Sequence, residues 1–527
     1  MAVNPVFPGP RPFTRAESGR FFGRTAEAAR LVSEWLTNPV TFLTGPAGIG
    51  KTSLLIAGAL PFVENRRSSV SLLPVGRLSG RDGTGYGRAT GCPVAILPPH
   101  NPYSLALLMS WSGSSAPAHL AGMTADDFLR DHAARHPDVL LLAAIDQADD
   151  LFAGPANRNP LRRRFLSELA AAVEELPQLR LLISVRPACL PDFISALGDR
   201  VRFQLDPMTP EKALAAAGGP GYFTRDAADA LVEGVRSSRI VSAPGKEQLL
   251  LSDMVEPALL QVVCATLWQS LHEGADVATL AELERFGDAP VDTALSGYCG
   301  AAIAAVAAAH DLPVEWLRNW LISTFITEVA DLSVPRDTDG APPTVVKALE
   351  DRYLLRGDAV AGRYRLLSGR LAEPLRGTAA PLTSEAPDPD DYLREAERAR
   401  VMGEHDLAHK IASLVLRMVD ESDLRRHAEA YSLIADVAYE RGQFDEAENY
   451  YRKAMALFQA RSQGDAVARL CAAVARTFIA RRKFAEALEQ LSAAVNRSSD
   501  LMLQEELAEV MARLTEGTAR KPPFAEG

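Results

Sequence analysis

Cysteine is scarce in this sequence, and the cysteines present show no pairing pattern. Five cysteines are scattered over 527 residues without a C-x-x-C pair, and the odd number leaves one over. This usage is typical of proteins from a reducing compartment. The N-terminus also lacks a charged segment followed by an apolar run, which argues against a secretory signal. We therefore expect a cytoplasmic protein.

An excess of basic residues is also lacking. Lys and Arg together number 56 against 67 Asp and Glu, which gives a net charge of −11, and only 8 of the basic residues are Lys. Broad binding to a phosphate backbone relies on clustered Lys and Arg. A nucleic-acid partner is therefore not expected, although this balance leaves room for a local basic site.

Long apolar runs are missing as well. The longest uncharged run, residues 293–310, consists mostly of Ala, Gly and Ser and is bracketed by two acids. We interpret it as a close-packed helix of a soluble protein, and we expect no membrane partner. Hydrophobic residues make up 47% and charged residues 23% of the chain, as in ordinary globular proteins. A chain of this length predicts three or four domains.

Residues 45–52 fit the phosphate-binding pattern G-x-x-x-x-G-K-[ST]. An apolar run, 40–44, precedes the pattern and a helical run, 53–57, follows it, so that backbone N–H groups can converge on phosphate oxygens. We predict that Lys51 reaches the β- and γ-phosphates and that the Thr52 hydroxyl binds Mg²⁺. The residues expected to hold ATP or ADP here are Gly45, Pro46, Ala47, Gly48, Ile49, Gly50, Lys51, Thr52 and Ser53.

Further apolar runs predict strands at 70–75, 139–145, 179–185 and 201–205, with helices between them. This alternation is typical of a doubly wound parallel sheet, whose ligand lies at the carboxyl ends of the strands. Asp146 and Arg186 each follow such a strand, so both should lie at the same rim as the phosphate-binding loop. We predict that Asp146 binds Mg²⁺ and that Arg186 senses the γ-phosphate. The alternative for Arg186 is an ordinary surface arginine.

The position after Asp146, where an acid often orients the attacking water in related ATPases, is Gln147. The next acids are Asp149 and Asp150, which are displaced and one methylene shorter than Glu. We predict that these carboxylates support a slow ATPase, and that such residues govern turnover more than binding.

The rest of the chain changes character several times. Residues 207–311 are helical in pattern, and 312–377 read as helices followed by a hairpin, which suggests a winged helix. Nine basic and nine acidic side chains balance in 312–377, which favours a protein-binding or regulatory winged helix over a DNA reader. Residues 378–391 are rich in Pro and acids and predict a linker.

Residues 392–514 predict tetratricopeptide-like repeats. Small and large residues alternate in 428–455 at the spacing of such a helix pair, recur about 40 residues later, and recur weakly around Gly403. A 40-residue step exceeds the usual 34, so helices or turns must be longer. The predicted solenoid has a concave binding surface; the alternative is a plain helical bundle. The tail, 515–527, is predicted to be disordered.

Together these segments resemble the STAND class of P-loop NTPases, in particular the bacterial novel STAND group. The resemblance covers residues 4–376 in one consistent order. It is carried by the phosphate-binding loop and by the motifs at 7–13, 21–24, 146–152, 205–208, 255–261 and 364–367.

The resemblance implies an extended lead-in (1–20), an α/β NTPase domain of AAA+/STAND type (21–206), a helical lid (207–311) and a winged helix (312–377), with the repeats as a sensor. It implies a switch in which ADP holds a closed form. A ligand or partner on the repeats and exchange to ATP then permit opening and homo-oligomerisation, in bacterial defence or signalling. By the same resemblance, Gly23 and Arg24 lie near the adenine and ribose, and Pro257 packs on the base.

Three features depart from the family pattern. Asp149-Asp150 stands where relatives usually show Glu-Glu, and Ser368-Gly369 replaces a His-Asp pair that contacts the diphosphate, which weakens the expected hold on ADP. No effector domain precedes the NTPase domain, so we expect a separate effector protein. Two alternatives stay open: a constitutive AAA+-like ATPase motor, and a repeat scaffold whose NTPase is a relic. The ligand of the repeats is not predicted.

Overall fold

The computed structural model describes the chain in two compact units. The first comprises residues 1–72, 138–149 and 177–386, and the second 73–137, 150–176 and 387–527. The predicted tail, most of the predicted linker and Gly403 lie outside the described residues. The described residues are 7–64, 70–78, 100–112, 120, 122–135, 137–152, 159–219, 221–243, 246–271, 277–287, 289–326, 334–335, 341–358, 363–377, 389–401, 405–499, 504, 507–508 and 510–512.

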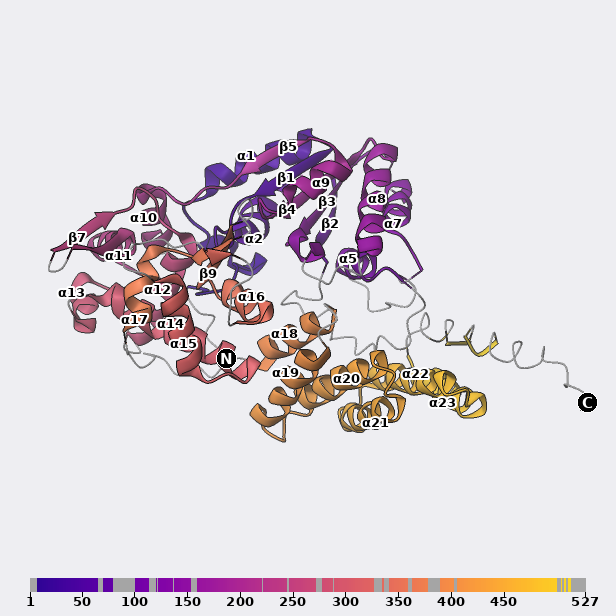
Figure 1. The fold of residues 1–527 in the computed structure, drawn as a ribbon. Helices are drawn as coiled ribbons and strands as arrows, with labels where there is room; N and C mark the ends of the chain where they lie inside the picture. The colour runs from indigo at the N-terminus through magenta and orange to yellow at the C-terminus, as the bar shows by residue number, and fades with distance from the viewer. Residues whose placement is uncertain are drawn as a thin grey trace, which may run out of the picture. The chain divides into compact units, whose positions relative to one another are not determined.

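A five-stranded sheet of order β2-β3-β4-β1-β5 is the frame of the P-loop region (Figure 1). Strands β3, β4, β1 and β5 run parallel, with Val40 opposite Leu181 and Ile145 opposite Ile183. Almost every residue of the three inner strands is buried, which explains their continuous apolar runs and confirms the predicted α/β class. The strands are β1 (Val40–Thr44), β2 (Val70–Arg77), β3 (Leu140–Asp146), β4 (Leu179–Val185) and β5 (Val201–Gln204).

The helix after β1 is continuous over residues 51–64, as α2 (Lys51–Ser53), a π-helical stretch (Leu54–Ala59) and α3 (Leu60–Glu64). Helix α1 (Thr25–Thr37) packs its fully buried Trp35 toward the sheet, where the indole Nε1 donates to the Arg180 carbonyl at 3.0 Å. This anchors the helix that leads into the loop strand.

The lead-in differs from the predicted extended segment. Residues 15–20 form a 3-10 helix. Phe7 is buried and packs on Phe223, with a ring-centroid distance of 5.4 Å. Large aromatic side chains bury enough area to order a proline-rich segment, so composition alone misjudged these residues.

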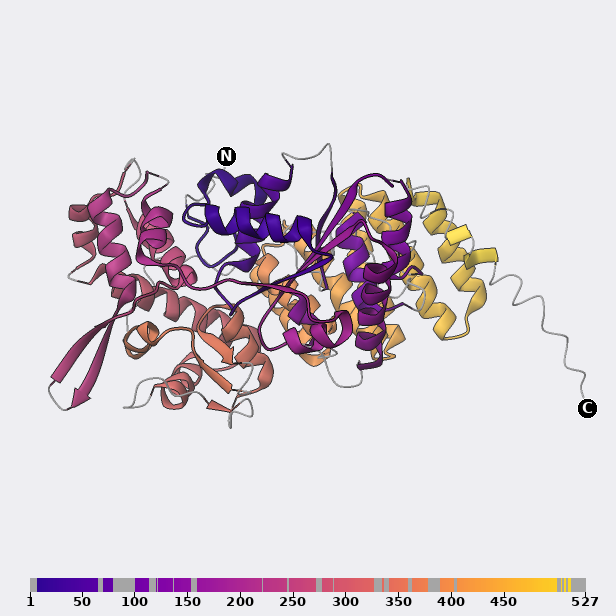
Figure 2. The same ribbon diagram turned by 90° about the horizontal axis from the view of Figure 1, so that it is seen from above.

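The segment predicted to be purely helical, 207–311, also contains a two-stranded antiparallel pair, β6 (Ser237–Ala243) and β7 (Lys246–Leu251). The pair extends away from the helices around it (Figure 2). Hydroxyl and β-branched residues in β6 favour a strand over a helix, a signal hidden between strongly helical neighbours. Those helices are α10 (Pro210–Gly218), α11 (Arg225–Arg236), α12 (Pro257–Ser270), α13 (Leu280–Leu283) and α14 (Pro290–His310).

Helix α14 is long and apolar enough to cross a membrane by length and composition alone. More than half of its most apolar window is buried inside the structure, as in the core helix of a soluble protein. Its Leu295, Ile303 and Val306 belong to the core that also joins α12 and the following helices.

After α15 (Val314–Phe325), helix α16 (Pro343–Asp351) leads into an antiparallel sheet of order β8-β10-β9. The three strands are β8 (Val334–Pro335), β9 (Leu355–Asp358) and β10 (Arg363–Leu366). A short α17 (Ala372–Arg376) closes the segment. The helix-then-hairpin order is as expected, while the assignment as a winged helix and the domain boundaries stay predictions.

The second unit contains α5 (Pro102–Ser112), α7 (Ala125–Arg135) and α8 (Asn159–Glu175). Glu168 Oε2 of α8 accepts bonds from the Ser104 hydroxyl of α5, at 2.6 Å, and from the Ala125 amide of α7, at 3.2 Å. Helical repeats form its C-terminal part. The second helices of two successive repeats begin at Phe444 and Phe484, so the 40-residue step follows from helices of up to 17 residues. The repeat helices are α18 (Pro389–Val401), α19 (His405–Met418), α20 (Leu424–Glu440), α21 (Phe444–Ala460), α22 (Gly464–Ala480) and α23 (Phe484–Arg497).

Candidate functional site

The loop between β1 and α2 has the backbone of a phosphate cradle. Gly48 and Gly50 have φ of 75° and 95°, a region that favours glycine. A Cβ on Gly45 would lie 2.7 Å from the Leu205 carbonyl oxygen, so this position requires glycine as well. A Cβ on Gly50 would meet no described atom within 4 Å, so the start of the helix faces open space. The residues present therefore fit a bound phosphate group.

Lys51 and Thr52 start the helix and have different partners. The Lys51 ammonium donates to the carbonyls of Gly45, at 2.6 Å, and Pro46, at 3.1 Å. The Thr52 hydroxyl donates to Asp146 Oδ2 at 2.8 Å, and Asp146 is fully buried at the end of β3. A hydroxyl beside a carboxylate is the ligand pair that Mg²⁺ accepts next to a phosphate.

Within the described residues, no group of three or more His, Cys, Asp or Glu side chains forms a metal site on its own. Mg²⁺ is usually held by one or two protein ligands together with water and phosphate oxygens, so the pair of Thr52 and Asp146 fits this ion.

A tight turn after β3 presents the next acid to β4. Gln147 has a φ of 54°, which is uncommon for a residue other than glycine, and it leads into the 3-10 turn Ala148–Phe152. Asp149 Oδ2 accepts a bond of 2.6 Å from Nε of Arg186, the residue that follows β4. The predicted residues Asp146, Asp149 and Arg186 thus lie at one rim. Asp150 is half-buried at the next position.

Sequence reasoning missed the second partner of Arg186. Its guanidinium also pairs with Glu350 near the end of α16, and the Glu350 side chain is only 3% exposed. Lys347, one turn earlier, lies 3.7 Å from Glu350 and 2.7 Å from Asp351. In sequence, α16 is an ordinary amphipathic helix, and nothing in it marks Glu350 as a residue of this rim.

The charges at the rim stabilise one another. Burial raises the pKa of the Asp149 and Glu350 carboxyls, but attraction by Arg186 and Lys347 outweighs burial and holds both pKa values below the usual range. Burial lowers the pKa of Arg186, while the two carboxylates raise it well above its usual value. Burial lowers the pKa of Lys51 to about 8, although Asp149 opposes the shift. The rim therefore holds ionised carboxylates against a fixed arginine.

Three later segments of the first unit contact the loop at Gly48. A Cβ on Gly48 would lie 3.2 Å from both Ala258 Cβ and Tyr353 Cδ1, and 3.6 Å from Leu367 Cδ1. Ala258 follows Pro257, the first residue of α12, so the predicted base-packing proline starts a helix beside the loop.

Tyr353, which follows α16, has a φ of 53°, another uncommon backbone conformation at this contact. Ser368 and Gly369 come directly after Leu367, whose side chain lies near Gly48 of the loop. The Ser368 hydroxyl accepts a bond from the Arg370 amide within its own turn.

Gly23 and Arg24 directly precede α1, and Gly23 lies against the backbone of α10. A Cβ on Gly23 would lie 2.3 Å from the Lys212 carbonyl oxygen, so only glycine fits. The buried Arg24 pairs with Glu27 at 3.2 Å and donates to the Asp206 carbonyl at 2.8 Å. Its guanidinium therefore fastens the start of α1 to the end of the sheet. The predicted contact with adenine and ribose stays a prediction.

The model of the family "Novel STAND NTPase 1" matches residues 6–355, which is more than half of the chain. This chain belongs to the novel STAND NTPase family. A tetratricopeptide repeat model matches residues 400–500 of the same STAND NTPase, which confirms the predicted repeats. A search of curated proteins found no significant match.

Three solved structures show a distant likeness to this STAND NTPase. A Walker-type ATPase of Pyrococcus abyssi is 15% identical with a TM-score of 0.36, covering 70% of this chain and 99% of that one. The ORC2 protein of Aeropyrum pernix, in an ADPNP–ADP complex, is 14% identical (TM-score 0.36; 67% and 93% covered). A STAND protein with a tetratricopeptide repeat sensor from Pyrococcus horikoshii is 14% identical (TM-score 0.26; 99% and 80% covered). Values this low establish no residue correspondence.

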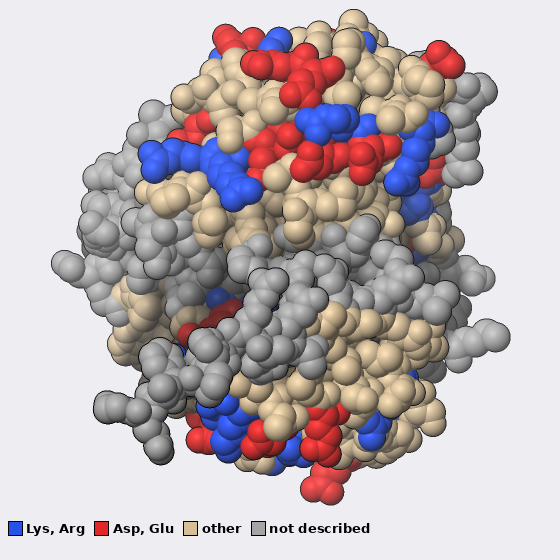
Figure 3. Space-filling view, turned by 90° about the vertical axis from the view of Figure 1, so that its right-hand side faces the viewer, with Lys and Arg blue, Asp and Glu red and all other residues tan. Residues whose placement is uncertain are grey.

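Among the described residues on the face drawn in Figure 3, acidic and basic side chains are interleaved. Nucleic-acid binding surfaces gather basic side chains on one face. The described residues on this face do not show that arrangement.

Proposed function

We propose that this STAND NTPase is an ATP/ADP-dependent signalling switch. In this proposal the C-terminal repeats sense a ligand or partner in the cytoplasm. Nucleotide exchange then drives opening and homo-oligomerisation, which recruit a separate effector in defence or signalling. The observation that carries the proposal is the place of Arg186 between two parts of the first unit. Arg186 lies at the rim with Lys51 and Asp146, and it also pairs with Glu350 of α16, the helix that leads to Tyr353 beside the loop.

The residues of the loop have distinct roles in this proposal. Backbone N–H groups and Lys51 bind the phosphates, and Thr52 and Asp146 hold Mg²⁺, which neutralises phosphate charge when bound. Arg186 senses the terminal phosphate. Asp149 would orient the attacking water, but its carboxylate is engaged by Arg186 in the present arrangement. Turnover should therefore be slow as long as α16 keeps its place.

The first test is the identity of the nucleotide that the purified protein releases on denaturation, together with its size in solution. We expect stoichiometric ADP in a monomer. The affinity for ADP should fall at least about 100-fold in Lys51→Ala, because the phosphates lose their buried cation. Lys410→Ala, at an exposed position of α19, is the matched control and should bind like the wild type.

Absence of nucleotide and equal affinities for the two variants would contradict the proposal. Steady turnover on the order of 1 s⁻¹ without any partner would instead indicate a constitutive motor. Unchanged function of Lys51→Ala in cells would indicate a scaffold with a relic NTPase.

A further inference from the structure

We propose that Glu350 makes the closed arrangement selective for a nucleoside diphosphate over a triphosphate. The inference rests on the proposed nucleotide binding and adds the residue that distinguishes the two ligands. It follows from where this carboxylate lies and from which cations it already engages.

Glu350 lies next to the cations that a terminal phosphate needs. Its Oε1 pairs with the Arg186 guanidinium and accepts a bond of 3.2 Å from the Gly357 amide. Its charge also acts on Lys51, the lysine of the phosphate-binding loop. One buried carboxylate therefore pairs with the rim arginine and adds a smaller electrostatic attraction at the loop lysine.

The Arg186 guanidinium already pairs with two carboxylates, those of Asp149 and Glu350. A terminal phosphate adds further negative charge to the same rim, and like charges that share a partner destabilise each other. A diphosphate lacks that group. Binding of a triphosphate should therefore require Glu350 to leave Arg186, while binding of a diphosphate should leave the pair intact.

Release of Glu350 from Arg186 would loosen the segment from α16 to β9. Glu350 lies at the end of α16, three residues before Tyr353, which contacts the loop at Gly48. Beyond Tyr353, Arg356 pairs with Glu256 at 2.8 Å, the residue just before α12. Because these contacts follow one another along a short stretch of chain, selectivity at Glu350 couples the phosphate count to the position of α16.

The test measures dissociation constants of the full-length protein for ADP and for the non-hydrolysable triphosphate AMP-PNP, both with Mg²⁺. We expect the wild type to bind ADP at least about 10-fold more tightly. Glu350→Gln, which removes the charge, should tighten AMP-PNP binding about 10-fold and change ADP binding less than about 3-fold. Glu350→Asp, which keeps the charge, should retain the preference for ADP.

Asp292→Asn is the matched control. It breaks another ion pair of the same unit, between α14 and Arg370, which makes no described contact with Arg186. This variant should leave the ratio of the two dissociation constants unchanged. An unchanged ratio in Glu350→Gln, an equal shift in Asp292→Asn, or loss of the preference in Glu350→Asp would each overturn the inference.

Failure of the inference differs from failure of the proposed function. If both nucleotides bind and Lys51→Ala weakens them, but Glu350→Gln leaves the ratio of the two dissociation constants unchanged, only the inference fails. If neither nucleotide binds the wild type, both fail.

Discussion

Two arginines, one in each compact unit, each pair with two carboxylates, although the Arg186 side chain is 21% exposed and the Arg400 side chain 7%. Arg186 at the loop rim is held by Asp149 and Glu350, which lie in segments far apart in sequence. Because the pair joins α16 to the sheet of the NTPase region, breaking it would free one element from the other. Beside it, Gly50 faces open space and the Lys51 ammonium donates to the Gly45 carbonyl.

Arg400 in the repeats is likewise held by two carboxylates, Glu397 at 2.5 Å and Glu440 at 2.6 Å. Burial lowers its pKa, and the carboxylates raise it well above its usual value, as for Arg186. Here, however, the partners belong to α18 and α20 of the stacked helices, and Asp436 and Tyr451 enclose the cluster. An ion-paired arginine alone therefore does not mark a functional site; what distinguishes Arg186 is its position beside the predicted phosphate-binding loop.

Of these substitutions, removal of Arg400 should have the largest effect on stability. Arg400→Ala removes a buried cation and leaves the partly exposed carboxylates of Glu397 and Glu440 next to the buried Asp436, which should lower the free energy of unfolding by up to about 3–5 kcal/mol. Denaturant unfolding of the full chain measures this loss. Arg417→Ala, an exposed arginine of α19, should change stability by less than about 0.5 kcal/mol. Altered nucleotide affinity in Arg400→Ala would contradict the structural role.

Removing Arg186 should act on chemistry instead. Arg186→Gln should lower the single-turnover rate of ATP hydrolysis about 100-fold, because the terminal phosphate loses a fixed positive charge. ADP affinity should change less than about 3-fold. Arg202→Gln, on the exposed side of β5, is the control and should hydrolyse ATP like the wild type. Equal hydrolysis rates for both variants would show that Arg186 has no role in ATP hydrolysis.

A smaller effect should come from Asp436 in the repeats. Burial raises the pKa of Asp436 to about 7, although Arg400 and the Tyr451 hydroxyl oppose the shift. The folded form therefore keeps the proton that the unfolded chain releases near pH 4. The stabilising contribution is complete at low pH and is lost as the pH rises to about 7.

The free energy of unfolding should thus be roughly 1–2 kcal/mol higher at pH 5.5 than at pH 8 on account of this residue. Asp436→Asn should remove that part of the pH dependence, as measured by denaturant unfolding at both pH values. The same dependence in wild type and variant would show that other groups cause it.

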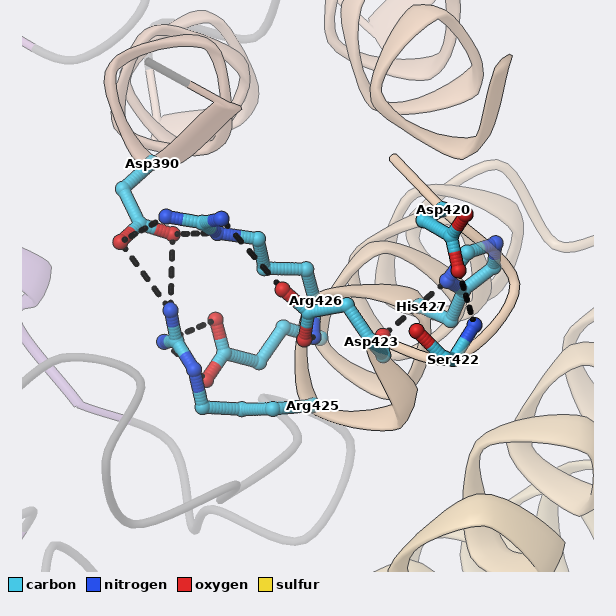
Figure 4. A network of polar contacts seen from close by, with 8 residues as sticks. Asp390, Asp420, Ser422, Asp423, Arg425, Arg426 and His427 are labelled. Atoms are coloured by element: carbon cyan, nitrogen blue, oxygen red, sulfur yellow. Dashed lines mark hydrogen bonds and ion pairs between the residues drawn. The ribbon is translucent and has the colours of Figure 1, made fainter. Parts of the chain in front are cut away.

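The smallest effect is expected at a partly exposed network of the repeats. Asp390 accepts bonds of 2.9–3.2 Å from Arg425 and Arg426, which lie at the start of α20 (Figure 4). Partly solvated pairs contribute little, so Asp390→Asn should cost about 0.5–1 kcal/mol, less at high salt. Asp406→Asn, which removes the fully exposed partner of Arg441, should have no measurable effect. If Asp390→Asn lowered the free energy of unfolding as much as Arg400→Ala, solvent exposure would not determine how much these ion pairs stabilise the fold.

The sequence predicts one side of the site much better than the other. The loop, Asp146 and Arg186 follow from local patterns and from the rule that parallel strands end at a common rim. The repeats follow from periodic small and large residues. The described structure brings these predicted residues together, with Thr52 bonded to Asp146 and Arg186 to Asp149.

Glu350 and Tyr353 could not be predicted in the same way, because their contacts depend on how α16 packs against a loop about 300 residues earlier in the chain. The strands β6 and β7 were missed for a different reason. Their short strand-favouring segment lies between strongly helical neighbours, which dominate any pattern read over a longer window.

We propose that the local stability of α16 depends on how many phosphates the bound nucleotide carries. Hydrogen–deuterium exchange of residues 343–351 in the full-length protein, saturated with ADP or with AMP-PNP, measures this dependence. We expect exchange to be at least about 10-fold faster with AMP-PNP, while α22 in the repeats exchanges equally in both states. Equal protection of residues 343–351 with both nucleotides bound would contradict the claim.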